Sequence, residues 1–215
     1  MRPTLRFNER FDDYGINRKI VKRKTRRGDY GLFANEPIAK GEIIYFEDDE
    51  IHYWDEVVLT VEELAELREE EFRVFWCYGT QRGINQFSGP LTFDSVTKDI
   101  GYFMNHSCDP TCWYIHDEAM EARRDIDAGD EITYDYSTSD IHRQCFECGC
   151  GAPNCRKRIT EIDWRLMKSV YGDHYLNYIN ELEKQLVEDG EKLADYLKYL
   201  NDLIKMIESS FLLLS

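Results

Sequence analysis

The feature that most constrains how this chain folds is a cysteine-rich loop about two-thirds of the way along it. Four of the seven cysteines lie between residues 145 and 155, and three of them follow the spacing Cys148-x-Cys150-x4-Cys155. The glycines and the proline between them allow the tight bend that three thiolates on one ion require. Structural zinc takes four ligands in a tetrahedron. The loop therefore predicts a metal site whose fourth ligand lies outside this triplet.

The spacing leaves this fourth ligand open among three cysteines. Cys145 and Cys112 are candidates, and Cys108 belongs to a distant segment that reaches the loop if the chain folds back on it. The alternative, a set of free buried cysteines, is disfavoured by so dense a cluster interleaved with glycines. An odd, clustered set of cysteines also argues against a secreted disulfide framework and favours a reducing compartment inside the cell.

A run of polar side chains inside an aromatic segment is the second unusual feature. Residues 102–114 read YFMNHSCDPTCWY, so residues 105–109 interrupt a stretch that otherwise suits a core. A buried polar group must find a hydrogen-bond partner or cost a few kcal/mol. We therefore expect a specific ligand or network to occupy this run. A nucleophilic pair of Cys108 and His106 is an alternative, although no obvious third group orients the histidine.

The charge of the chain narrows its partners. Its 42 acidic and 27 basic residues give a formal net charge of −15. Phosphate is also negative, so we expect a basic protein segment as partner and no direct contact with nucleic acid. Residues 18–27, RKIVKRKTRR, are expected to be a solvated first strand, with a nuclear address or nucleic-acid patch as the alternative. The sequence shows no signal peptide and no membrane span, which predicts a soluble protein with no membrane partner.

The local pattern predicts mostly short strands with one internal helix. Residues 15–50 contain strands and turns typical of a meander. A helix is predicted over 60–76, where Thr60 and Glu63 suit a capping box. Residues 79–100 are rich in turn residues and predict a loop with at most one short strand. A further strand is expected at 131–136.

The residues after 160 predict a helical extension. Asp189-Gly190 interrupts the pattern, so the extension is either one interrupted helix or a hairpin of two. We expect its apolar stripe to pack on its own domain, and the alternative is a coiled coil that forms a homodimer. The stripe has a seven-residue spacing with intervening seam positions and consists of Ile179, Leu182, Leu186, Leu193, Tyr196, Leu200, Leu203 and Ile207.

Three motifs in order along the chain resemble the SET-domain protein lysine methyltransferases. They are the turn GDYGLFA at 28–34, the run YFMNHSCDP at 102–110, and AGDEITYDY at 128–136 followed by CGCGAPNC at 148–155. The resemblance covers roughly residues 15–158. It implies a mainly β fold with helices (α+β), a β-clip of small sheets with knot-like threading near its C-terminal end. It also implies S-adenosylmethionine as the methyl donor.

The resemblance assigns residues to the cofactor and to the metal. By similarity, the segment with Gly28, Tyr30, Gly31 and Phe33 would wrap S-adenosylmethionine, and Asn105, His106 and Tyr102 would contact it. The polar run would then face a cofactor instead of a core. By the same similarity the zinc ligands would be Cys108, Cys148, Cys150 and Cys155, and zinc would staple the loop over the active site. One departure is Glu47, which stands where the family often has a tyrosine near the segment GEIIYF.

The resemblance also assigns the catalytic side chains. Tyr136 matches the family's catalytic tyrosine, which would orient the lysine amine in line with the methyl group of the donor. The pKa of the lysine must fall as it enters an aromatic, desolvated channel. Tyr134 sits where the family uses Phe or Tyr to set how many methyl groups fit, and a tyrosine there favours mono- or dimethylation.

We therefore expect a SET domain at 15–140 with a variable insert at about 51–95, a post-SET cysteine loop at 141–158 and a helical extension at 159–215, after an N-terminal segment at 1–14. The expected activity is lysine methylation of a basic protein, most favourably a histone tail, in the nucleus or cytoplasm. Acidic residues at 62–71 in the insert would steer such a peptide. The main alternative is a catalytically inactive, zinc-stabilised interaction module that binds a partner through its helical tail.

Overall fold

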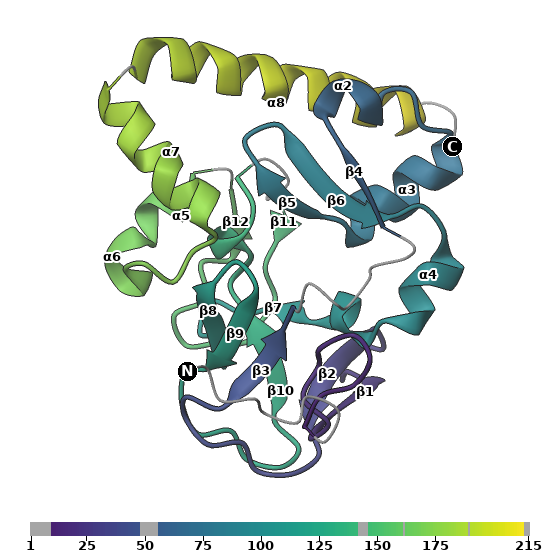
Figure 1. Cartoon of the computed structure of the whole chain (residues 1–215), viewed down its shortest axis with the longest axis vertical. Helices are drawn as coiled ribbons and strands as arrows, with labels where there is room; N and C mark the ends of the chain where they lie inside the picture. The colour runs from purple at the N-terminus through teal and green to yellow at the C-terminus, as the bar shows by residue number, and fades with distance from the viewer. Residues whose placement is uncertain (1–9, 48–55, 142–145, 161, 189, 213–215) are drawn as a thin grey trace, which may run out of the picture.

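Small β-sheets form the lower and middle parts of the molecule, and helices lie across its top and on both sides (Figure 1). The computed structural model describes residues 10–47, 56–141, 146–160, 162–188 and 190–212. Of the predicted N-terminal segment, residues 1–9 lie outside this range, and so does Cys145. The fold is the mixed α+β architecture that the sequence predicts, with strands concentrated before residue 135 and helices after residue 162.

A four-stranded sheet in the order β1-β2-β10-β7 brings two distant motifs together. Its strands are β1 (Ile20–Lys24), β2 (Tyr30–Ala34), β10 (Glu131–Tyr134) and the two-residue β7 (Asn105–His106). β7 runs parallel to β10, with Asn105 opposite Thr133 and His106 opposite Tyr134. Parallel neighbours need a crossover between them. Here it contains β8 (Cys112–His116) and β9 (Ala119–Ala122), which pair with β3 (Ile43–Phe46) in a separate sheet.

The main core lies between these two sheets. Leu32 and Ala34 of β2, Ile44 of β3 and Ile132 of β10 are fully buried in it, together with Ile126 before β10. Burial of side chains of this size is worth about 1.5–3 kcal/mol each, which fixes the register of the strands that carry them. Over 15–50 the expected strands form, but the expected meander was wrong: β1 and β2 make an antiparallel pair, whereas β3 pairs with β9 in the other sheet. The knot-like threading stays a prediction.

The insert between β3 and β7 has more regular structure than the sequence predicts. β4 (Glu56–Leu59), β6 (Gln86–Pro90) and β5 (Thr80–Gly83) form a three-stranded sheet, followed by α4 (Phe93–Lys98) and the 3-10 turn η1 (Ile100–Phe103). The predicted loop over 79–100 was therefore wrong. Gly79 and Gly89 suggest turns in sequence, yet they let β5 and β6 approach closely, since a Cβ on Gly89 would lie 2.6 Å from the Cα of Gly79.

The helix predicted over 60–76 is two helices, so that prediction was also wrong. The capping box of Thr60 and Glu63 forms as expected and begins α2 (Val61–Leu64). Arg68 then adopts an extended conformation at the start of α3 (Glu69–Tyr78), and its backbone N–H donates to Oε2 of Glu71 at 3.1 Å. The break lets Val61, Leu64, Phe72 and Phe75 all reach one buried cluster.

The extension consists of helices that pack on the rest of the chain. The short α5 (Asp163–Leu166) and α6 (Lys168–Tyr171) lead into α7 (Asn177–Glu188), and α8 (Gly190–Leu212) crosses the insert (Figure 1). Leu200, Ile204 and Ile207 of α8 are buried against the insert. Ile179 and Leu182 of α7 are buried in a cluster with Trp164 and Tyr171.

The apolar stripe of the extension is therefore used within the chain. Its members with described side chains are buried or partly buried except Tyr196, which is 39% exposed; the side chains of Leu186 and Leu193 lie outside the described part. The expectation that the stripe packs on its own domain is confirmed for the described side chains. The alternative, a homodimer through this stripe, receives no support.

Candidate active site

The end of β10 and the neighbouring β7 place the predicted catalytic residues side by side. Tyr134 is the last residue of β10, and Tyr136 begins the 3-10 turn η2 (Tyr136–Thr138). Their rings lie 4.9 Å apart between centroids. The ring of His106 packs edge-on to Tyr136 at 5.3 Å. Residues 30 positions apart in sequence thus form one aromatic group, because β7 and β10 pair.

Hydrogen bonds hold Tyr136 at both ends. Its hydroxyl donates to the backbone oxygen of Met104 at 3.0 Å, and its backbone N–H donates to Nδ1 of His106 at 3.2 Å. His106 is buried, and this burial lowers its pKa to about 4 although Asp135 opposes the shift. A neutral imidazole that accepts at Nδ1 carries its proton on Nε2, which lies 3.4 Å from Sγ of Cys108. His106 therefore links Tyr136 to the cysteine cluster.

Asn105 connects the segment around Gly31 to β10. Its side-chain amide donates to the backbone oxygen of Tyr30 at 3.0 Å and to Oε1 of Glu131 at 2.8 Å. A Cβ on Gly31 would lie 2.5 Å from Glu131 Oε1 and 2.9 Å from Asn105 Nδ2, so only glycine allows this approach. Tyr30, 47% exposed, packs edge-on to Phe103.

The structure brings only part of the predicted cofactor set into direct contact. Tyr30, Gly31 and Asn105 meet as described. Gly28 lies in the β1–β2 turn at φ +95, where a Cβ would have no neighbouring atom within 4 Å. Phe33 is half-buried on β2 opposite Glu131. Tyr102 instead lines a cavity and donates a short hydrogen bond to Glu56 of the insert.

The four cysteines that the resemblance assigns to zinc lie together. The Sγ atoms of Cys108, Cys148, Cys150 and Cys155 are all within 4.8 Å of one another. Tetrahedral zinc with bonds of about 2.3 Å sets sulfur atoms about 3.8 Å apart, and Sγ of Cys108 is 3.8 Å from Sγ of Cys148. Four thiols at this spacing fit a structural zinc ion. The cluster joins the polar run to the loop that contains β11 (Phe146–Glu147) and β12 (Arg158–Ile159).

The other described cysteines have different surroundings. Cys112 is fully buried, its thiol lies 3.2 Å from the backbone oxygen of Thr133, and burial raises its pKa. It is therefore excluded as the fourth ligand of this cluster. Cys77 is exposed at the edge of the cavity. The nucleophilic pair of Cys108 and His106 is disfavoured because burial raises the pKa of the Cys108 thiol and neither residue lines the cavity.

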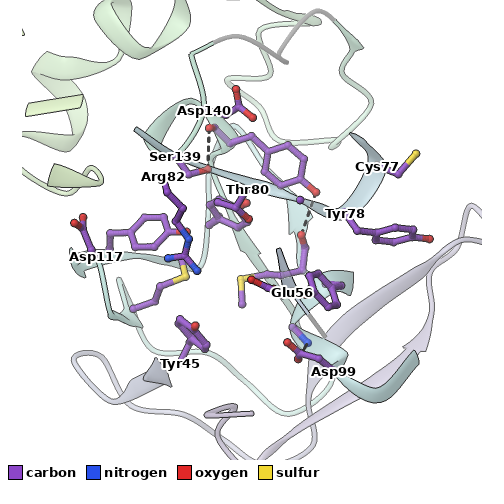
Figure 2. A pocket seen from close by; sticks show the side chains of 18 of the residues that line it. Tyr45, Glu56, Cys77, Tyr78, Thr80, Arg82, Asp99, Asp117, Ser139 and Asp140 are labelled. Atoms are coloured by element: carbon purple, nitrogen blue, oxygen red, sulfur yellow. Dashed lines mark hydrogen bonds between the residues drawn. The ribbon is translucent and has the colours of Figure 1, made fainter. Parts of the chain in front are cut away.

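A cavity of ≈ 250 Å³ opens beside Tyr134 and Tyr136 (Figure 2). Its walls come from the sheets, the insert and the turn η2. Aromatic residues dominate: Tyr45, Trp76, Tyr78, Tyr102, Tyr114, Tyr134, Tyr136 and Phe146. Its carboxylates are Glu56, Asp99, Asp117 and Asp140. Such a cavity suits a long apolar chain with a positively charged end, since aromatic faces and carboxylates both attract cations.

Arg82 of β5 is the cation that lines this cavity among the described residues. Figure 2 shows it reaching into the space from the insert. Its guanidinium pairs with Glu47 at 3.3 Å, and Glu47 also accepts a hydrogen bond from the hydroxyl of Tyr45 at 3.2 Å. Glu47 is the residue that departs from the family pattern, and the structure shows that its carboxylate has a partner from the insert.

The sequence analysis did not predict the residues that the insert contributes to this cavity. Glu56, Tyr78 and Arg82 lie in segments where the sequence shows only periodicity or turn residues. The one signal was Glu47, a charge at an expected aromatic position, which calls for a buried countercharge.

The site thus combines an aromatic cavity lined by carboxylates with a cluster of four cysteines that His106 links to Tyr136. A family model described as "SET domain" matches residues 29–137, and the chain belongs to this family. The match includes residues 29–34 of the glycine turn, the polar run and both tyrosines, whereas Gly28 and the cysteine loop lie outside it.

Similar proteins include two curated relatives. A variant-silencing SET domain-containing protein of Plasmodium falciparum is 32% identical over 187 residues, 82% of this chain and 7% of the relative. A histone-lysine N-methyltransferase, H3 lysine-36 specific, of Debaryomyces hansenii is 28% identical over 202 residues, 86% of this chain and 25% of the relative. The chain thus spans a quarter or less of the length of these relatives. Among solved structures, KRYPTONITE in complex with mCHG DNA and SAH matches with a TM-score of 0.42 at 21% identity, covering 65% of this chain and 28% of that one.

Proposed function

We propose that this chain is an S-adenosylmethionine-dependent protein lysine N-methyltransferase that acts on a basic protein, most favourably a histone tail. The observation that carries the proposal is that Tyr134 and Tyr136, the latter packed against His106, line an aromatic cavity that also holds carboxylates. Family membership and the histone-lysine methyltransferases among its relatives support it. A histone substrate would place the protein in the nucleus, and a basic cytoplasmic protein is the alternative.

The surface around Tyr30 and Asn105 fits the cofactor. Gly31 lets the side chains of Asn105 and Glu131 lie against its backbone, and the half-exposed ring of Tyr30 offers an aromatic face for a base. The Nζ of Lys22 lies 4.1 Å from the centre of the Phe103 ring beside it, a cation that suits a carboxylate. Tyr30, Gly31 and Asn105 would hold S-adenosylmethionine, with Gly28, Phe33, His106 and Tyr102 in supporting contacts. When bound, it supplies a methyl group on a positively charged sulfur.

The cavity would prepare the lysine for this methyl group. The carboxylates attract the ammonium form to the mouth, and the aromatic walls then remove water from the chain. Desolvation lowers the pKa of an amine, which favours the neutral nucleophile. Tyr136, fixed by Met104 and His106, would orient that amine. Tyr134 narrows the same space and would favour mono- or dimethylation.

The cysteine cluster would hold one zinc ion that fastens the post-SET loop at 141–158 beside the active site. The thiolates of Cys108, Cys148, Cys150 and Cys155 are the ligands. We also propose the division into a SET domain at 15–140, with its insert at 51–95, and a helical extension at 159–215. The inactive interaction module predicts the same fold and metal with no methyl transfer.

The test is a radiolabelled methyl-transfer assay on core histones and on a basic whole-cell lysate, with Tyr136→Phe alongside the wild type. We expect label in a specific protein, and a loss of about 100-fold in the variant, because a misplaced amine costs about this much. The fold should survive, since one hydroxyl contributes about 1 kcal/mol. Absence of label with the wild type, together with absence of cofactor binding in calorimetry, would favour the interaction module.

A further inference from the structure

The helical extension is hydrogen-bonded to the turn that contains Tyr136. Three hydrogen bonds join them. The hydroxyl of Tyr171 donates to Oδ2 of Asp135 at 2.9 Å, the hydroxyl of Tyr178 donates to the backbone oxygen of Ser139 at 2.9 Å, and the backbone N–H of Leu176 donates to the oxygen of Thr138 at 3.0 Å. These contacts hold residues on both sides of Tyr136.

Asp135 is the buried centre of this arrangement. Its side chain has no exposed surface. Besides Tyr171, it accepts from Arg156 at 2.7 Å and from the backbone N–H and hydroxyl of Ser137 at 3.1 and 2.9 Å. A buried carboxylate that loses a donor is strongly destabilised in that position. The hydroxyl of Tyr171 therefore helps to fix Asp135, the residue directly before Tyr136.

Tyr178 acts on the other end of the turn. Ser139 follows η2 and lines the cavity with Asp140. The N–H groups of Ser139 and Asp140 both donate to the backbone oxygen of Tyr136, at 3.1 Å each. The hydrogen bond from Tyr178 to the oxygen of Ser139 therefore restrains residues 139 and 140, which bond back to Tyr136. These residues also form one wall of the cavity.

We infer that Tyr171 and Tyr178 of the extension are positioning residues for methyl transfer, acting through Asp135 and Ser139 on Tyr136. The inference rests on the proposed function for its catalytic consequence. The restraint of residues 135–140 by two hydroxyls of the extension does not depend on that function. It gives the extension a role in the active site in addition to its packing on the insert.

Tyr175 provides a matched control. It lies in the same extension, is as buried as Tyr171, and its hydroxyl donates to the backbone oxygen of Trp164 at 3.0 Å. That bond is internal to the extension. Tyr175→Phe therefore removes a buried hydroxyl and destabilises the extension without removing a hydrogen bond to the turn.

The first measurement is amide hydrogen exchange, by mass spectrometry, of peptides covering residues 135–140 in full-length Tyr171→Phe, Tyr178→Phe and Tyr175→Phe. The amides of residues 136–140 are all hydrogen-bonded, so their exchange reports how firmly the turn is held. We expect exchange to rise about fivefold or more in the first two variants and to stay near the wild-type rate in the third. Equal effects in all three, or no effect in any, would overturn the inference.

The second measurement is steady-state methyl transfer by the same variants. Positioning predicts that kcat falls about tenfold in Tyr171→Phe while KM for the cofactor changes less than about twofold. The losses from Tyr171→Phe and Asp135→Asn should add to less than their sum in the double variant, because both changes alter the contact between Tyr171 and Asp135. Fully additive losses would refute action through Asp135. A wild type without methyl transfer would refute the proposed activity, while hydrogen exchange would still decide whether the extension restrains the turn.

Discussion

Asp99 shows how burial sets the charge of a side chain in the cavity. It precedes η1, is 7% exposed, and accepts from the N–H of Gly101 at 2.6 Å. Burial raises its pKa from 3.8 to about 7, and the nearby carboxylates of Asp12 and Glu56 add to the rise. Asp99 is therefore largely neutral below pH 7 and becomes a buried anion above it.

This pKa predicts how Asp99→Asn changes stability with pH. Between about pH 4 and pH 7 the unfolded chain has lost the Asp99 proton and the native chain keeps it, so this group makes the native state less stable as pH rises through that window. The asparagine keeps the oxygen that accepts from Gly101 and removes the penalty. We expect its gain in the free energy of unfolding to be about 2 to 3 kcal/mol larger at pH 8 than at pH 5.

Urea unfolding of Asp99→Asn and wild type at both pH values measures this difference. Asp94→Asn, on α4 with an exposed carboxylate, controls for the loss of one negative charge. A gain that is the same at both pH values would contradict the assigned cause.

Tyr134 gives a prediction about the product. Tyr134 lines the cavity and carries a hydroxyl, and its ring lies 4.9 Å from that of Tyr136 and packs edge-on to Tyr114 at 5.9 Å. Tyr134→Phe removes that hydroxyl and leaves room for a further methyl group. We expect the main product to shift by one methyl group upward, with a change in kcat of less than about tenfold. Mass spectrometry of the methylated peptide measures the number of methyl groups added. An unchanged product distribution would mean that another residue limits this number.

Among the residues of the site, the sequence motifs predicted those at the paired strands β7 and β10. They did not predict the residues that the insert contributes to the cavity. The family motifs in the sequence contain three residues of the site, Asn105, His106 and Tyr136, so a short stretch of sequence was enough to predict them. Arg82 and Glu56 enter the cavity because the insert folds over it, and neither has a local signature. Their placement depends on tertiary contacts such as the pair of Arg82 with Glu47, which no periodicity encodes.

Among the elements, the cysteine cluster joins two segments that otherwise make few bonds to each other. β11 and β12 are two residues long, and Arg156 donates to Sγ of Cys108 through its backbone N–H at 3.4 Å. A metal that ties Cys108 to this loop therefore contributes most of its order. Removing the metal should expose the loop to proteolysis and lower methyl transfer, while the core sheets stay folded.

Two cysteine variants test the cluster. Cys108→Ala and Cys112→Ala each remove a buried thiol from the same segment, and of the two only Cys108 belongs to the cluster. We expect Cys108→Ala to lose the single zinc and to be cleaved in residues 141–160 by limited proteolysis, whereas Cys112→Ala keeps the metal. Zinc content by absorption after denaturation measures this. Equal zinc in the two variants would exclude Cys108 as a ligand.

Apart from the meander, the elements that sequence analysis mispredicted belong to the insert. The capping box at Thr60 was correct, but the second helix begins at Arg68, whose backbone N–H and guanidinium both donate to Glu71, and arginine is not a residue that N-cap propensity predicts. Over 79–100, glycines that favour turns instead permit close strand contact. By contrast, the strands at 20–46 and the heptad-like stripe followed their hydrophobic pattern, because burial on one face leaves few alternatives.

At the scale of the whole molecule, the extension joins the insert to the SET core. α8 buries Leu200, Ile204 and Ile207 against the insert, and Trp76, which lines the cavity, donates to Glu208 of α8 at 2.7 Å. The same extension reaches the turn with Tyr136 through α6 and α7. The helical extension therefore contacts two parts of the chain that line the cavity, the insert and the turn with Tyr136. Among the helices of the described residues, none combines the length and apolar composition that a bilayer crossing requires.

The charge of the whole chain predicts a salt-dependent reaction. The formal net charge is −15, and the cavity itself presents Glu56, Asp117 and Asp140. The acidic residues at 62–71 contribute less than the sequence suggests, because Glu69 and Glu71 pair with Arg73 and Arg68. A basic peptide should therefore be attracted by the overall field and by the cavity carboxylates more than by that helix face.

Screening tests this electrostatic attraction directly. The Debye length falls from about 30 Å at 0.01 M salt to about 8 Å at 0.15 M. We expect kcat/KM for a basic peptide to fall about tenfold over that range, through KM, because exposed charges then interact only at short distance. A peptide with the same target lysine and neutral flanking residues should change less than about threefold. If both peptides respond equally, the salt acts on the enzyme or its cofactor, and the acidic field has no part in choosing a basic substrate.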